Sequence, residues 1–178
     1  MADNVSALSN EIDVDKINVV MERVGRLGTE VDSMVDMIVK EASFELDLYM
    51  ADIDKILTSQ STPVTDIQLD DFVLNLPSIL YSTSSALEKL GIKEDVSKAV
   101  QKEVFNRVRE KAQGTIADKD TAAELQTQSE YIVFVVHNRA YRKVKLRIEA
   151  GWEMLNSVKK VISRRIAEYE LTISDRGR

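Results

Sequence analysis

Apolar residues recur at alternating steps of three and four through the first third of the chain. The residues on this stripe are Ile17, Val20, Val24, Leu27, Val31, Met34 and Ile38. Such steps place side chains on one face of a helix, and three heptads of them indicate a coiled-coil seam. From Met34 to Leu46 the steps become four, four and four, a stutter that locally unwinds a left-handed supercoil. The stripe continues to Ile56, so the pattern predicts one long helix over residues 13–57.

The last third carries a second stripe, in which every seventh residue is apolar. These residues are Phe134, Tyr141, Ile148, Leu155, Ile162 and Tyr169. The second seam position of each heptad lies three residues later, and it is occupied by His137, Val144, Gly151, Val158 and Arg165. Only one side of the stripe is therefore consistently apolar. Thr121 and Glu124 have capping-box spacing, which predicts a long helix over residues 120–172. The β-branched and aromatic run 131–136 also fits a strand, although no Gly or Pro bounds it.

The region between these two stripes predicts shorter helices. A loop rich in Ser, Thr and Pro precedes it. Thr65 and Gln68 then match the capping box that begins a helix. Gly91 is a natural C-cap, and a further helix follows before Gly114. We therefore expect short central helices over residues 66–114.

Proline and glycine raise the question of how continuous the helices are. Pro77 suits the first turn of a new helix better than an interior position, because proline lacks a backbone donor. Gly25 and Gly28 each cost a helix about 1 kcal/mol relative to Ala. They either weaken the first helix or allow another helix to approach closely. An unbroken last helix would span about 75 Å, which is too long for a compact globule. Either a break falls near Gly151, or the protein is elongated and packs against other chains.

Together these elements predict an elongated, all-α helical protein in which two long, coiled-coil-like helices flank shorter central helices. Composition agrees, because 6 Gly and 2 Pro in 178 residues favour a few long elements over many turns. The chain begins with small polar residues, so we expect a flexible tail over residues 1–12. Residues 13–178 then form a single helical domain.

Long apolar stripes need a partner surface, so the sequence also predicts a homo-oligomer. The expected interface residues are Ile17, Val24, Val31, Ile38, Phe134, Tyr141, Ile148, Leu155 and Ile162. On the same seam, His137 is either a partly buried, hydrogen-bonded side chain or a pH-sensitive or register-setting contact. Arg165 either extends its guanidinium to solvent or pairs with an acid on a partner helix.

The net charge of −6 conceals an acidic first part of the chain and a basic last part. Residues 1–130 carry 25 acidic and 13 basic side chains, whereas residues 131–178 carry 5 acidic and 11 basic ones. No stretch approaches the roughly 20 apolar residues that span a bilayer. The N-terminus lacks the basic and then apolar pattern of a secretory signal. We therefore expect no membrane partner and a cytoplasmic location.

The residues that most enzyme classes need are scarce. The chain has no Cys and 1 His, and it lacks Gly-rich phosphate loops and paired His motifs. No two carboxylates lie three residues apart, which argues against the magnesium-binding helices of all-α nucleotide pyrophosphohydrolases. Pairs four residues apart, such as Asp32 with Asp36 and Glu41 with Glu45, are typical of a solvated helix face. We predict a non-enzyme that has neither a metal nor a cofactor.

A basic cluster in the last third is the main positive indication of function. Its members, with one aromatic residue among them, are Arg139, Arg142, Lys143, Lys145, Arg147, Trp152, Lys159, Lys160 and Arg164. Such fields bind phosphate backbones, and an exposed indole can stack on an unpaired base. Alternatively, the cluster packs along the acidic first helix, where residues 1–57 carry 13 acids against 5 bases. The residue pattern leaves both interpretations open.

Residues 141–165, YRKVKLRIEAGWEMLNSVKKVISRR, resemble the basic C-terminal helix of phage UvsY-type recombination mediators. The matching positions are Trp152 and Leu155 in the hydrophobic repeat and Lys159, Lys160, Arg164 and Arg165 on the basic face. The resemblance covers about 40 of 178 residues. It implies a phage-encoded oligomer that binds single-stranded DNA and loads a recombinase. The alternative is a structural or assembly protein, such as a virion scaffold or adaptor, in which the charges only order helices.

Overall fold

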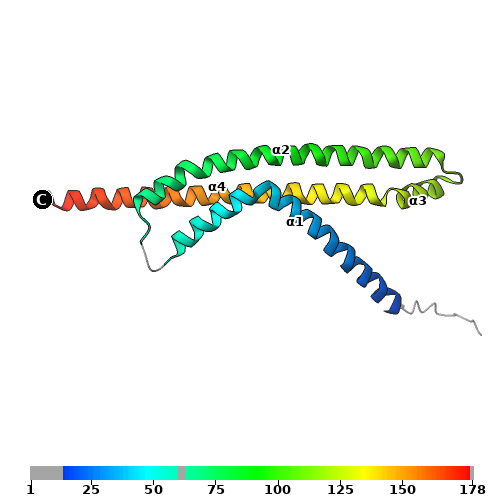
Figure 1. The fold of residues 1–178 in the computed structure, drawn as a ribbon, viewed down its shortest axis with the longest axis horizontal. Coiled ribbons are helices and arrows are strands. Elements are labelled where there is room, and N and C mark those ends of the chain that lie inside the picture. Colours follow the sequence, from blue (N-terminus) through cyan, green and yellow to red (C-terminus); the bar gives the residue numbers. More distant parts are fainter. Residues whose placement is uncertain (1–13, 60–62, 177–178) are drawn as a thin grey trace, which may run out of the picture.

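The computed structural model describes residues 14–59 and 63–176, so the predicted tail over residues 1–12 lies outside the described residues. The described residues form the helices α1 (Val14–Thr58), α2 (Asp66–Lys111), α3 (Ile116–Gln126) and α4 (Gln128–Arg176). No strand occurs in the described ranges, and the run 131–136 belongs to α4. The predicted class is therefore confirmed, because this is an elongated all-α protein (Figure 1) in which the long helices α1 and α4 come before and after the central helical region in the chain.

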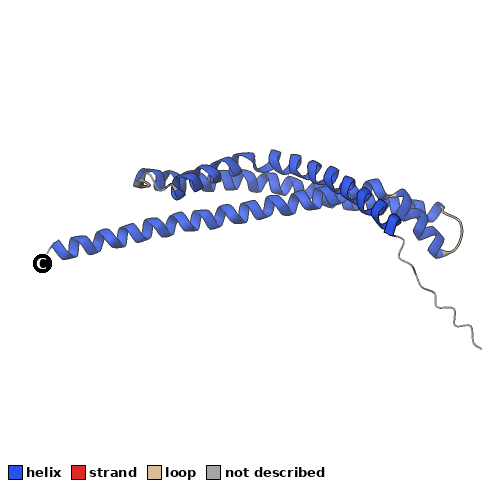
Figure 2. Cartoon of the chain, turned by 90° about the horizontal axis from the view of Figure 1, so that it is seen from below, coloured by secondary structure: helices blue, strands red, loops and turns tan. Residues whose placement is uncertain are grey.

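The three long helices lie side by side in an extended bundle. Asp36 and Asp47 of α1 pair with Lys143 and Arg147 of α4 in the same order, so α1 and α4 are parallel. Near the end of α4, Arg165 pairs with the first residue of α2, and α3 links the two helices at their other end, so α2 and α4 are antiparallel. The end of α4 projects beyond the bundle in both views (Figure 1, Figure 2). The N-terminal half of α1 diverges from α2 and α4 (Figure 1).

The core is an apolar seam to which all three long helices contribute. Its most deeply buried side chains include Val35, Val39, Leu46, Ile53, Leu69, Leu76, Leu80, Val144, Leu155 and Val158. On α4 the predicted heptad steps hold from Val144 to Ile162. Earlier on α4 the buried residues are Val136 and Ala140, at steps of four, and the predicted seam residue Tyr141 is only half-buried. Steps of four rotate the buried stripe away from a heptad seam, which accounts for the shift.

The central region differs from the expected set of short helices. α2 runs for 46 residues without interruption through Pro77 and Gly91. An interior proline costs about 3 kcal/mol, and burial of Leu76 and Leu80 on either side, at about 1.5–3 kcal/mol each, offsets that cost. At Gly91 the ring of Tyr141 lies 3.4 Å from the place that a Cβ would occupy, so packing supports the helix there. The expected helix boundaries at Pro77 and Gly91 are therefore wrong.

Two capping boxes mark helix starts, one of them at the predicted place. The Gln68 backbone N–H donates a hydrogen bond to Thr65 Oγ1 at 3.3 Å, which confirms the predicted start of α2. The second box joins Thr115 and Asp118 at the start of α3, where two hydrogen bonds from Thr115 lower the pKa of the Asp118 carboxyl. The predicted cap at Thr121 is wrong, because the Thr121 hydroxyl donates to a backbone carbonyl inside α3. A separate short helix therefore precedes α4.

The long helices continue through their glycines. Gly25 and Gly28 lie inside α1, and Gly151 lies inside α4, so the alternative of a break near Gly151 is excluded. A Cβ at Gly151 would lie 2.6 Å from Leu80 Cδ2 and 3.4 Å from Leu46 Cδ1. The missing side chain thus lets α1, α2 and α4 approach one another closely.

Candidate nucleic-acid interface

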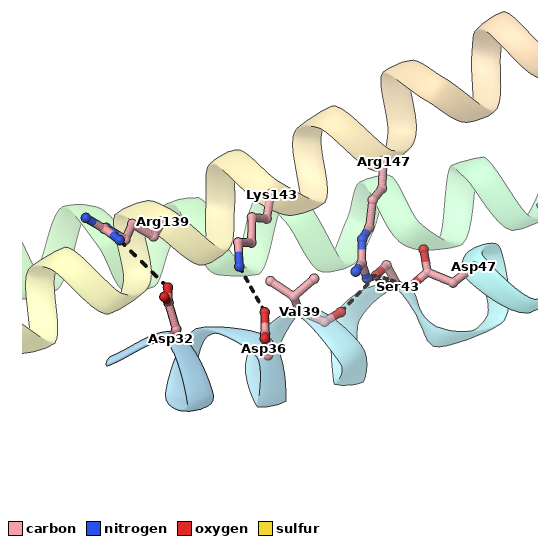
Figure 3. Close-up of polar contacts among 8 residues, drawn as sticks. All are labelled: Asp32, Asp36, Val39, Ser43, Asp47, Arg139, Lys143 and Arg147. Carbon is pink, nitrogen blue, oxygen red and sulfur yellow. Dashed lines mark hydrogen bonds and ion pairs between the residues drawn. The ribbon is translucent and has the colours of Figure 1, made fainter. Parts of the chain in front are cut away.

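One side of α4 is joined to α1 by ion pairs (Figure 3). Lys143 Nζ lies 2.9 Å from Asp36 Oδ1, and Arg139 Nη1 lies 3.8 Å from Asp32 Oδ1. Both helices supply these residues at a spacing of four, so parallel packing brings the two pairs into register together. All four side chains are substantially exposed, which limits each pair to about 0–1 kcal/mol.

A third contact on this side is set more deeply. Arg147 pairs with Asp47, and its Nη1 donates to Ser43 Oγ at 2.6 Å. Ser43 is only 1% exposed, and its hydroxyl lies 2.8 Å from the Val39 carbonyl oxygen, to which it donates. The guanidinium therefore closes a polar network at the edge of the core and holds α4 against α1 (Figure 3).

Charge pairing within the chain therefore accounts for Arg139, Lys143 and Arg147 of the predicted cluster. The sequence does not single out the acidic partners of these cations, because Asp32 and Asp36 fit a solvated helix face. Asp32 and Asp36 are four residues apart, as are Arg139 and Lys143. This shared spacing predicts the ion pairs only when α1 and α4 are known to lie side by side.

The two polar residues of the predicted α4 seam, Arg165 and His137, differ in their polar contacts. Arg165 Nη1 lies 2.6 Å from Asp66 Oδ1, and Arg165 Nη2 donates to the Val64 carbonyl oxygen at 2.6 Å. The Arg165 guanidinium thus binds the start of α2 within the same chain. His137 is half-buried between α2 and α4, and its Nδ1 has no hydrogen-bond partner within the described part of the chain.

A different side of α4 carries cations that the bundle does not use. Arg142, Lys145, Lys159 and Lys160 are exposed, and none of them has an ion-pair partner among residues 14–59 and 63–176. Arg142 and Lys160 are 18 residues apart, about five helical turns, so they lie on one line roughly 27 Å long. We call these four cations, together with Trp152, the outer face of α4.

Trp152 is 48% exposed and lies in sequence between the two pairs of outer-face cations. Glu149 and Glu153 are exposed nearby, so the positive charge falls into two separate pairs. The predicted Arg164 is highly exposed and forms a 2.9 Å pair with Glu168 one turn further along α4. An exposed indole flanked by cations has the composition of single-strand binding surfaces.

The predicted oligomer-interface residues divide according to their burial. Ile148 and Leu155 are 8% and 1% exposed and belong to the core of this chain, so their assignment to an intersubunit contact is wrong. The reason is that α1 and α2 cover the face that the sequence left without a partner. Val31, Ile38, Tyr141 and Ile162 are partly buried against the same core, and Phe134 is half-buried. Ile17 and Val24 are 47% and 58% exposed on the diverging half of α1.

Among the described residues, none of the helices has an apolar stretch of the length needed to span a bilayer. No group of three or more His, Asp or Glu side chains in those residues is placed to hold a metal ion.

Comparison of the chain with protein-family models, with curated proteins and with solved structures found no match.

Proposed function

We propose that this protein is a non-enzymatic, oligomeric accessory protein of phage DNA recombination or replication, which binds single-stranded DNA through the outer face of α4. The supporting observation is a set of four cations around the half-exposed Trp152 that have no ion-pair partner within the described residues: Arg142, Lys145, Lys159 and Lys160. An acidic protein does not need such a field for solubility. The resemblance of residues 141–165 to recombination mediators supports the same class, with a recombinase as partner and the host cytoplasm as location.

In this proposal the two cation pairs contact phosphates and the indole stacks on a base between them. Phosphate contacts carry no sequence information, so binding is expected to be insensitive to sequence. The ion-paired residues Arg139, Lys143 and Arg147 then act indirectly, because they hold α4 in place and leave the outer face free.

A second candidate is an assembly protein, such as a virion scaffold or adaptor. It is supported by the same three ion pairs, because they engage three of the eight predicted cations in contacts between helices. It is also supported by the exposed apolar stripe at the start of α1, where Ile17 and Val24 remain uncovered. This candidate requires no affinity for nucleic acid.

Fluorescence anisotropy with a labelled oligothymidylate separates the two candidates. At about 50 mM salt the protein should bind, and four phosphate contacts predict a slope of log affinity on log salt near −3. Charge reversal at Lys159 and Lys160 to Glu should weaken binding, whereas the same reversal at the exposed α2 residues Lys98 and Lys102 should change it little. No binding at low salt, or equal losses in the two variants, would support the assembly role instead.

A further inference from the structure

An apolar groove runs between α2 and α4 beyond the region that α1 covers. Its apolar lining comes from Ile92, Val96 and Val100 of α2 and Val133 of α4, with His137 beside them, and its volume is about 580 Å³. Ile92, Val96, Val100 and Val133 are 60%, 56%, 43% and 48% exposed. Adjacent apolar side chains of this size are unusual on a surface that has no partner.

The groove continues the surface that α1 occupies further along the bundle. On α2, Asp71 accepts a 3.1 Å hydrogen bond from Tyr49 of α1. Val100 lies 29 residues beyond Asp71, about eight helical turns, and so projects from the same side of α2. On α4, Val133 lies 11 residues before the buried Val144, about three turns, and so shares its face. The groove is thus the empty end of an established three-helix interface.

The diverging half of α1 carries the matching apolar surface. Ile17, Val20, Met21, Val24 and Leu27 are 47%, 58%, 65%, 58% and 43% exposed. They occupy the two seam positions and one flanking position of the heptad, which makes the stripe wider than a two-stranded coiled coil needs. A stripe of this width fits a groove between two helices.

The register of the ion pairs places these two surfaces at the same level. Asp32 pairs with Arg139 and Asp36 with Lys143, so α1 and α4 are offset by 107 residues. Extending that offset toward the N-terminus brings Leu27 opposite residue 134, next to Val133 of the groove. The start of α1 leaves the bundle (Figure 1), because α1 is one unbroken helix that does not turn toward the groove.

We propose that residues 22–30 of α1 from a second copy of this chain occupy the groove, in the register that continued packing of α1 would give. Exchange between two copies fills both grooves and covers the Val24 and Leu27 end of both stripes through one two-fold interface. A second copy satisfies this geometry without a kink in α1. The inference specifies the oligomeric part of the proposed function and does not depend on the DNA-binding part.

Disulfide cross-linking tests this contact cleanly, because the chain has no Cys. A Leu27→Cys protein mixed with a Val133→Cys protein under mild oxidation should give a cross-linked dimer that contains one chain of each kind. The doubly substituted chain should also cross-link between copies. Cross-linking within a single chain would show that α1 folds back on its own groove. Dimers of Leu27→Cys alone would show that α1 pairs with α1. Either result overturns the proposal.

Sedimentation of single-residue variants provides an independent check. Val24→Glu on the stripe and Val100→Glu in the groove should each convert a micromolar dimer into a monomer. Val19→Glu is the matched control, because Val19 is 66% exposed and lies about 140° around the helix axis from Val24. A monomeric parent protein, or equal effects of Val19→Glu and Val24→Glu, would refute the exchange. Binding of single-stranded DNA is measured on the same samples. A monomer that still binds DNA refutes only the helix exchange, and a dimer that does not bind DNA refutes only the proposed DNA-binding function.

Discussion

Lys143 and Asp36 form a 2.9 Å ion pair that joins the basic helix to the acidic one. One residue earlier on α4, Arg142 is exposed and has no such partner within the described residues. Neighbouring cations on α4 therefore face different surroundings. Lys143 lies against α1, and Arg142 belongs to the outer face. This separation by face assigns Lys143 to helix packing and leaves Arg142 on the outer face.

The network around Arg147 predicts a specific loss of stability. Arg147→Ala removes the hydrogen bond that the guanidinium donates to the buried Ser43 hydroxyl, and it removes the cation that pairs with Asp47. Because the guanidinium is 38% exposed, we expect a loss of about 1–2 kcal/mol in the free energy of unfolding. Arg142→Ala, on the outer face, should stay within about 0.5 kcal/mol. Urea denaturation measures both variants, and equal effects would contradict the assignment of Arg147 to the bundle.

Glycine-to-alanine substitutions should have opposite signs in α1 and α4. A Cβ at Gly25 meets nothing within 4 Å, so Gly25→Ala should stabilise by about 0.5–1 kcal/mol through helix propensity. At Gly151 a Cβ would lie 2.6 Å from the buried Leu80, and overpacking of about 1–3 kcal/mol should exceed that gain. Thermal melts followed by circular dichroism compare the two. Stabilisation by Gly151→Ala would show that the helices are not closely packed there.

We expect the contact between Tyr49 of α1 and Asp71 of α2 to weaken at high pH. Burial, and then the hydrogen bond and negative charge of Asp71, raise the Tyr49 pKa above 10.0. The folded state thus favours the neutral phenol. That contribution is complete below pH 10 and is lost as pH rises through the raised pKa. Tyr49→Phe should cost about 0.5–1.5 kcal/mol at pH 8, and the difference from the parent should shrink above pH 10. A difference that does not change with pH would refute this linkage.

Trp152 provides a direct optical test of base stacking, because it is the only Trp in the chain. Its fluorescence should fall when oligothymidylate binds, since the indole is 48% exposed on the outer face. Trp152→Ala should weaken binding by about 1–3 kcal/mol and leave the melting temperature nearly unchanged. Unchanged fluorescence at saturating DNA would mean that the indole does not contact the bases.

The helical class and the two long helices were predictable because heptad spacing is a local property of the sequence. The stripe is buried from Val144 to Val158 and partly buried at Ile162, and the Thr65 cap begins α2 at the expected place. The breaks expected at Pro77 and Gly91 do not occur, because packing from α4 and the neighbouring leucines offsets the local cost. Helix ends depend on tertiary contacts in a way that apolar periodicity does not.

The candidate site was predictable as a cluster of residues but not as separate faces. Sequence spacing places Arg142 and Lys143 together, and only the position of α1 assigns one to solvent and the other to Asp36. The same limit applies to Ile148 and Leu155, which the sequence placed at an interface between chains. An apolar stripe shows that a helix needs a partner, without showing whether that partner lies in the same chain.

The most direct measurement compares charge reversal on the two faces of α4 in one experiment. Arg142→Glu with Lys145→Glu changes the outer face, and Arg139→Glu with Lys143→Glu changes the face toward α1 by the same charge. The outer-face variant should lose about ten-fold or more in oligothymidylate affinity at about 50 mM salt and keep its melting temperature. The inner-face variant should lose melting temperature and show the smaller change in affinity while it is folded. Equal affinities for the parent and the outer-face variant would contradict the proposed DNA-binding face.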